Sequence, residues 1–292
     1  MVKPVDYKQG DYKWGSLYYA VDGEKSTIKS AGCGPTSMAD VLASIVSPYI
    51  DPITISSWAR YHNYKVKNSG TSYNFFVACG KAYGVNVKRL NTTNVYGKPG
   101  NNIHIAAKNE LQAGNWLIAC MGKGNWTSSG HYVVAYGLDG DNVLINDCGS
   151  TKANRAKNSW ALFTSQVKYY WAVEVPESVK KKGIVTSGEY KKEDFIREVQ
   201  MALGANMDGI YGSQTLSCTV TVSKAKNRKH TVVLPLQKRL KYLGFYKDAC
   251  DEIAGNNFND ATKSFQVIHV KMRNGDGEFT ARGKSWKTIL TI

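Results

Sequence analysis

A cysteine between two glycines stands directly before a helix signal, at Ser30-Ala31-Gly32-Cys33-Gly34-Pro35-Thr36-Ser37. Apolar residues then recur at spacings of three and four, as on one face of a helix: Met38, Val41, Leu42 and Ile45. Proline favours the first helical turn, so we expect the helix to begin near Pro35. Cys33 would then lie at the helix N-terminus, where free N–H groups and the helix dipole stabilise a thiolate. The stretch predicts either a nucleophilic cysteine or a small buried cysteine at a glycine-rich turn.

A cysteine nucleophile needs a base to take its proton and a third group to orient that base. Among the five histidines, His131 follows a glycine-containing loop and opens an apolar strand, so its ring can project from a rigid element. The strand is predicted to return as a β-hairpin that ends at Asn146-Asp147. Which of these two residues shares a face with His131 depends on the loop and stays open at this point.

The pattern along the first 175 residues is helical at first and strand-like afterwards. Helical spacing covers residues 35–46, 54–62, 75–83 and 104–112, and strands are expected at 116–120, 131–136, 143–147 and 169–175. Helices followed by antiparallel strands predict the α+β class.

A polar, lysine-rich stretch begins at Pro176, and the sequence beyond it repeats itself. The run Val199 to Thr215 is echoed from Leu236 to Gln266, and each unit reads as a short helix, a glycine-containing turn and the start of another helix. We therefore predict a catalytic domain over 1–178, a basic linker over 179–189 and a small, mainly helical domain over 190–292.

The net charge of +15 is spread over both halves and predicts an anionic partner. No nucleic-acid recognition motif accompanies the charge, and no apolar run is long enough for a membrane span. The N-terminal residues contain no apolar signal-peptide core. The six cysteines form no Cys-x-x-Cys pair, so we expect reduced thiols, with neither a metal nor a cofactor.

The first 175 residues resemble the papain-like cysteine peptidases, in particular the family related to bacteriocin-leader peptidases. The residues that carry the resemblance are Gln9-Gly10-Asp11 with Trp14, Gly32 to Thr36, Gly70-Thr71-Ser72, Gly130 to Gly137 and Val143 to Asp147. The resemblance implies a papain-like fold with Cys33 as nucleophile and His131 as general acid and base. It further implies that Asp147 orients His131, with Asn146 as the alternative, and that Gln9 is an oxyanion donor. Cys148 stands where this family often has proline.

The last 100 residues resemble the peptidoglycan-binding domain of bacterial cell-wall hydrolases, through the run Asp208 to Thr215. In the second unit, Ala249 to Glu252 replaces the usual Asp-Gly turn. The insert Thr219 to Val233 is rich in lysine and arginine and is either a binding loop for an anionic polymer or a solvated loop.

Together, the two resemblances imply a phage-type lysin that cleaves a peptide amide bond in peptidoglycan, an endopeptidase. It would stay in the host bacterial cytoplasm until release and then act at the cell wall on peptidoglycan and anionic wall polymers. Three alternatives stay open: cleavage of the muramic acid–alanine bond by an amidase, a leader peptidase, and a wall-binding protein without activity.

Overall fold

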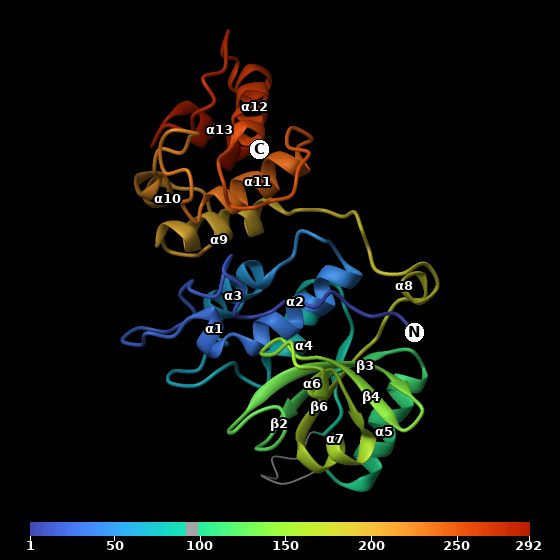
Figure 1. Cartoon of the computed structure of the whole chain (residues 1–292). Coiled ribbons are helices and arrows are strands. Elements are labelled where there is room, and N and C mark those ends of the chain that lie inside the picture. The colour runs from blue at the N-terminus through green and yellow to red at the C-terminus, as the bar shows by residue number, and fades with distance from the viewer. Residues whose placement is uncertain (92–98) are drawn as a thin grey trace. The chain divides into compact units, whose positions relative to one another are not determined.

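The computed structural model describes residues 1–91 and 99–292 (Figure 1). The chain divides into two compact units, Met1–Gly188 and Glu189–Ile292. The stretch predicted as a basic linker, 179–189, is ordered at its start. Its first residues lie in helix α8 (Glu177–Lys182), which buries Val179. Farther along, the Val185 N–H donates to the carbonyl of Ser44. Most of this stretch therefore belongs to the first unit. No helix in the described residues has the length and apolar character to cross a membrane.

The first unit is built on an antiparallel sheet, which within the described residues has six strands in the order β1-β6-β2-β3-β4-β5. The strands are β1 (Val87–Arg89), β2 (Trp116–Met121), β3 (His131–Asp139), β4 (Asn142–Asn146), β5 (Lys157–Ser159) and β6 (Val167–Val173). The helices are α1 (Ile28–Ala31), α2 (Cys33–Ile45), α3 (Pro52–Tyr61), α4 (Phe75–Ala82), α5 (Asn101–Gln112), α6 (Ala153–Ala156), α7 (Trp160–Gln166) and α8. This arrangement confirms the predicted α+β class.

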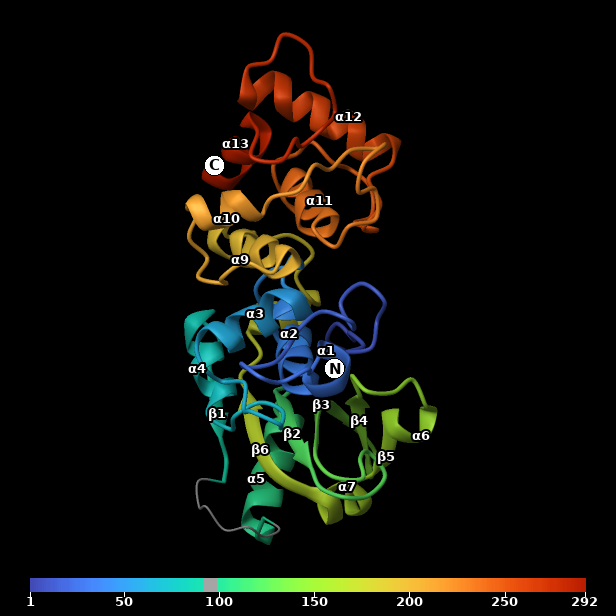
Figure 2. The same cartoon turned by 90° about the vertical axis from the view of Figure 1, so that its left-hand side faces the viewer.

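The sheet is enclosed between two groups of helices. Helices α1 to α4 gather on one side, and α5 and α7 lie at the other (Figures 1 and 2). The core facing α5 and α7 includes Ala107, Leu111, Leu117, Ala119, Val133, Ala135, Val143, Ile145 and Phe163. Burying these side chains holds β2, β3 and β4 as one rigid surface, from whose ends polar side chains can project.

Helix α2 runs through the centre of the unit, and every residue from Gly34 to Ser44 is buried. Small residues such as Ala39 and Ala43 let neighbouring elements approach closely. The helix begins at Cys33, two residues before the expected start near Pro35. Pro35 still fits, because its missing N–H falls among the first N–H groups of a helix, which have no partner within the helix. Cys33 is therefore the first helical residue.

The second unit contains α9 (Lys192–Leu203), α10 (Ser213–Cys218), α11 (Val233–Tyr242), α12 (Asn256–Phe265), the π-helix η1 (Gln266–Val270) and α13 (Lys284–Thr291). The structure describes every residue of this unit. Three fully buried glutamines, Gln200, Gln237 and Gln266, each hold one of three equivalent turns. In each, the amide nitrogen donates to an aspartate at 2.7 Å, and the amide oxygen accepts a turn N–H at 2.9 Å. The unit thus has three repeats, where the sequence suggested two.

The middle repeat keeps this turn without its glycine. Glu252 takes a left-handed φ of 62°, where the first and third repeats have Gly209 at 73° and Gly277 at 76°. A residue with a β-carbon is strained there, by about 1 kcal/mol or more. The hydrogen bond from the Glu252 N–H to Gln237 helps to hold the turn in that conformation.

Candidate active site

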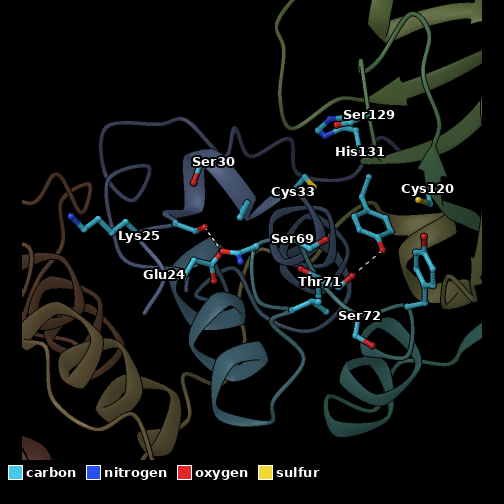
Figure 3. Close-up of a pocket in the computed structure, with 18 residues that line it drawn as sticks. Glu24, Lys25, Ser30, Cys33, Ser69, Thr71, Ser72, Cys120, Ser129 and His131 are labelled. Atoms are coloured by element: carbon cyan, nitrogen blue, oxygen red, sulfur yellow. Dashed lines mark hydrogen bonds between the residues drawn. The ribbon is translucent and has the colours of Figure 1, made fainter. Parts of the chain in front are cut away.

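Cys33 lies in an open cleft of about 1090 Å³, which His131, Tyr132, Thr71 and Tyr73 also line (Figure 3). Both of its glycine neighbours are required by close contacts. A β-carbon on Gly32 would lie 2.5 Å from the carbonyl oxygen of Ile28, and one on Gly34 would lie 2.8 Å from Oγ1 of Thr71. The glycines therefore let the Cys33 turn pack between α1 and the loop at Thr71.

His131 reaches the same cleft from the start of β3, while Cys33 reaches it from α2 (Figure 3). Its Nε2 lies 2.7 Å from Oδ1 of Asp147, and its ring also hydrogen-bonds the sulfurs of Cys148 and Cys33. Because Nε2 faces the carboxylate, Nδ1 is the ring nitrogen left for sulfur. The three side chains form the series thiol, imidazole and carboxylate that an acyl-transfer site needs.

The hairpin decides which residue faces His131. Its pairing sets Ile145 opposite Ala135 and Asn146 opposite Val134, with a bulge beyond Ala135. Side chains alternate along a strand, so Asp147, two residues after Ile145, lies on the face of His131. Asn146 instead donates to the carbonyl oxygens of Val5 at 3.0 Å and Pro4 at 3.3 Å. The structure therefore places Asp147, and not Asn146, against the imidazole.

The site favours a charged pair. Burial opposes the Cys33 thiolate, but the hydrogen bond and charge of His131 outweigh burial and lower the pKa of Cys33. The N–H of Gly34, in the first turn of α2, acts in the same direction. Burial also opposes the imidazolium, yet the neighbouring cysteine sulfurs and Asp147 raise the pKa of His131. Burial opposes ionisation of Asp147 too, and its bonds to His131 lower its pKa nonetheless.

Gln9 ends an N-terminal strap, residues 4–9, that crosses α2 and the end of β4. The Tyr7 N–H donates to Asp40 of α2 at 2.7 Å, and the Val5 N–H to Ser44 at 2.8 Å. The Gln9 N–H donates to the carbonyl of Cys148 at 2.9 Å. Folding thus brings Gln9 beside the residue that follows Asp147, although it lies far from Cys33 in sequence.

Sequence reasoning missed three charged residues near the site. Arg155 donates to the second oxygen of Asp147 at 3.4 Å and to the Trp126 carbonyl at 2.9 Å. Lys65 and Glu24 form an ion pair at 2.8 Å, with side chains 0% and 5% exposed. No local motif marks these residues: Lys65 and Glu24 are 41 positions apart, and Arg155 reaches Asp147 across a loop.

The Lys65–Glu24 pair holds one wall of the cleft. The Lys65 ammonium also donates to the carbonyls of Val66 and Ser69, at 2.7 and 2.8 Å. Burial opposes ionisation of Glu24, but bonds from Lys65 and Ser26 lower its pKa to about 2. Because the folded pKa is depressed, the pair stabilises the fold above the unfolded pKa of about 4.3, and this contribution is lost as pH falls towards 2.

Lys65→Met is therefore expected to lower the free energy of unfolding of the first unit by about 1–3 kcal/mol, because Glu24 loses its counter-charge and keeps only the bonds from Ser26 and Val21. Urea unfolding followed by tryptophan fluorescence measures this, since six of the seven tryptophans lie in residues 1–188. Lys67→Met, at an exposed position two residues on, is the matched control and should change stability by less than about 0.5 kcal/mol. Equal effects of the two substitutions would contradict the assignment.

In the part of the chain that the structure covers, no group of three metal-ligating side chains is placed to hold an ion. A comparison with curated proteins gives no match. The model of the Peptidase_C39 like family matches residues 16–173, more than half of the chain. This match includes Cys33, His131 and Asp147 and supports the papain-like cysteine peptidase architecture around them. The chain belongs to the Peptidase_C39 like family of cysteine peptidases.

Proposed function

We propose that this protein is a peptidoglycan hydrolase of the phage-lysin type, an endopeptidase that cleaves an amide bond in the wall peptide. The observation that carries the proposal is the series Cys33, His131 and Asp147 at an open cleft. A lowered thiol pKa beside a protonated imidazole is the state in which a cysteine attacks a carbonyl. The alternative of an inert wall-binding protein is disfavoured because every member of this series is present and in contact.

The reaction follows from the geometry. The Cys33 thiolate attacks the carbonyl carbon of the scissile amide, and a carbon–sulfur bond forms. Gln9 and the N–H groups at the start of α2 stabilise the oxyanion. As the carbon–nitrogen bond breaks, His131 gives its proton to the leaving amine and a thioester is left on Cys33. His131 then takes a proton from water, which attacks the thioester and releases the carboxylate and the free thiol.

The second unit supports a wall substrate. Its glutamine-held turns extend the Asp-Gly run on which the resemblance to peptidoglycan-binding domains rests. The basic insert presents Lys224, Lys226, Arg228 and Lys229, all exposed. This charge suits a wall that carries anionic polymers. We assign catalysis to residues 1–188 and wall binding to residues 189–292, with activity at the cell wall.

Mass spectrometry of fragments released from purified peptidoglycan tests the enzymatic proposal. An endopeptidase frees a new amine inside the wall peptide and leaves the peptide attached to muramic acid. An amidase instead frees the N-terminal alanine and leaves sugar chains without peptide, which would replace the endopeptidase assignment. Absence of any fragment, from a folded protein that binds the wall, would favour the inert alternative.

The separate units give a further prediction. The fragment 189–292, checked for helical circular dichroism, is expected to sediment with cell walls, while the fragment 1–188 stays mostly in solution. At limiting concentration, 1–188 should solubilise walls about tenfold more slowly than the full chain, because tethering raises the local concentration of the catalytic unit. Co-sedimentation over a salt series measures both fragments. A folded 189–292 fragment that stays in solution at low salt would contradict the wall-binding assignment.

A further inference from the structure

Cys148 is buried beside the proposed active site, and the reaction above makes no use of it. Its Sγ lies 3.4 Å from Oε1 of Gln9, 3.6 Å from the carbonyl oxygens of Cys33 and Tyr132, and 3.8 Å from Oγ of Ser37. The side chain therefore touches the turn that carries the nucleophile and the glutamine assigned to the oxyanion. It also hydrogen-bonds the ring of His131.

The thiol has one proton to donate among these acceptors. Gln9 Oε1 is the nearest of them. The Tyr132 carbonyl already accepts from Ser37 at 3.3 Å, and the Cys33 carbonyl lies in the first turn of α2, where it accepts a helical N–H. Burial raises the pKa of Cys148 to about 11, so the thiol keeps this proton at neutral pH.

The amide of Gln9 is held at both ends. Its Nε2 donates to the Lys29 carbonyl at 2.6 Å, while its Oε1 faces the Cys148 thiol. A flipped amide would set oxygen against the Lys29 carbonyl, which has no proton to offer, and would lose the bond from sulfur. An amide nitrogen carries two protons, so one N–H bonds Lys29 and the other is left for a ligand.

We propose that Cys148 is a positioning residue, whose thiol fixes the amide of Gln9 so that its second N–H faces the developing oxyanion. The proposal rests on the proposed function, in which Gln9 serves as oxyanion donor. An oxyanion donor contributes most when its direction is set before the reaction, since no reorganisation is then needed at the transition state. Cys148 does not line the cleft, and we assign its effect to Gln9. Its sulfur also hydrogen-bonds His131, so the test has to separate these two contacts.

A double-mutant cycle with Gln9 tests the proposal on soluble peptidoglycan fragments, with rates divided by the amount of Cys33 that iodoacetamide titrates. Cys148→Ala is expected to lower kcat about tenfold with little change in KM, less than the loss of about 100-fold or more expected for Gln9→Ala. In the Gln9→Ala protein, Cys148→Ala should have no further effect on kcat. Cys148→Ser should restore kcat to within about threefold, because its hydroxyl can donate to Gln9.

Cys79→Ala is the matched control, since Cys79 is equally buried, on α4, and lies outside the proposed machinery. It should cost stability by leaving a cavity but keep kcat per titrated site. Equal losses from Cys148→Ala with and without Gln9, failure of Cys148→Ser to restore kcat, or an unchanged kcat in Gln9→Ala would each overturn the proposal. Absence of any released fragment with the folded wild-type protein would instead overturn the proposed function itself.

Discussion

Cys33→Ala is expected to lower the rate of wall solubilisation by about 10⁴-fold or more, because the carbon–sulfur bond of the thioester cannot form. The fold should persist, since the substitution removes one partly exposed sulfur and alanine favours the helix. The loss of turbidity of purified walls measures the rate, and co-sedimentation shows that wall binding is kept.

Thiol chemistry gives this prediction its control. Iodoacetamide at neutral pH should label Cys33 first, because its pKa is lowered, and should spare Cys120 in the same cleft, whose pKa burial raises to about 12. Cys218→Ala, at a partly exposed position of the second unit, should keep full activity. A folded Cys33→Ala protein that still clears walls would contradict the assignment of Cys33 as nucleophile. Cys148 would then be the next thiol to test.

Sequence could predict those parts of the site whose position is set by neighbouring residues. Cys33 is placed by the helix that begins at it, and His131 by the strand that begins at it. The choice between Asn146 and Asp147 could not be made in this way. It depends on a bulge between Ala135 and Gly137 that shifts the pairing of the hairpin.

Long-range contacts account for what sequence reasoning left undecided or missed. Gln9 lies beside Cys148 because Asp40 and Ser44, both buried on α2, hold the N-terminal strap. The positions of Asp40 and Ser44 in the sequence do not indicate that they bind this strap. In the second unit, the sequence did not indicate the third repeat, because Gln266 was assigned to the end of the second repeat. The turn that Gln266 holds lies ten residues later, at Asp276. Such turns are defined by a distant glutamine more than by their glycine, as Glu252 demonstrates.

The geometry makes Asp147 the second residue on which the rate depends steeply. Its Oδ1 lies 2.7 Å from His131 Nε2 and accepts the Gly149 N–H at 2.8 Å. Arg155 contacts the other oxygen. A carboxylate held in this way fixes the imidazole with Nδ1 towards sulfur and stabilises the imidazolium.

Asp147→Ala is therefore expected to lower kcat by about 10²- to 10⁴-fold. Asp147→Asn should fall between this variant and the wild type, because an amide oxygen can still accept from the ring N–H but offers no charge. Asn146→Ala is the adjacent control. It should lower stability, because its bonds to Pro4 and Val5 are lost. The rate per folded molecule should change much less, since Gln9 keeps its backbone bond to Cys148.

The pH dependence separates an orienting carboxylate from a structural one. Asp147 raises the pKa of His131, so its loss lowers that pKa. The imidazolium then gives up its proton at lower pH, and the alkaline limb of the activity profile shifts to lower pH. The thiolate loses part of its counter-charge at the same time, so iodoacetamide labelling of Cys33 should begin at higher pH. If Asp147 only held the loop at Gly149, Asp147→Ala would lower the melting temperature and leave both pH profiles in place. Unchanged profiles and turnover in a well-folded Asp147→Ala protein would contradict the orienting role.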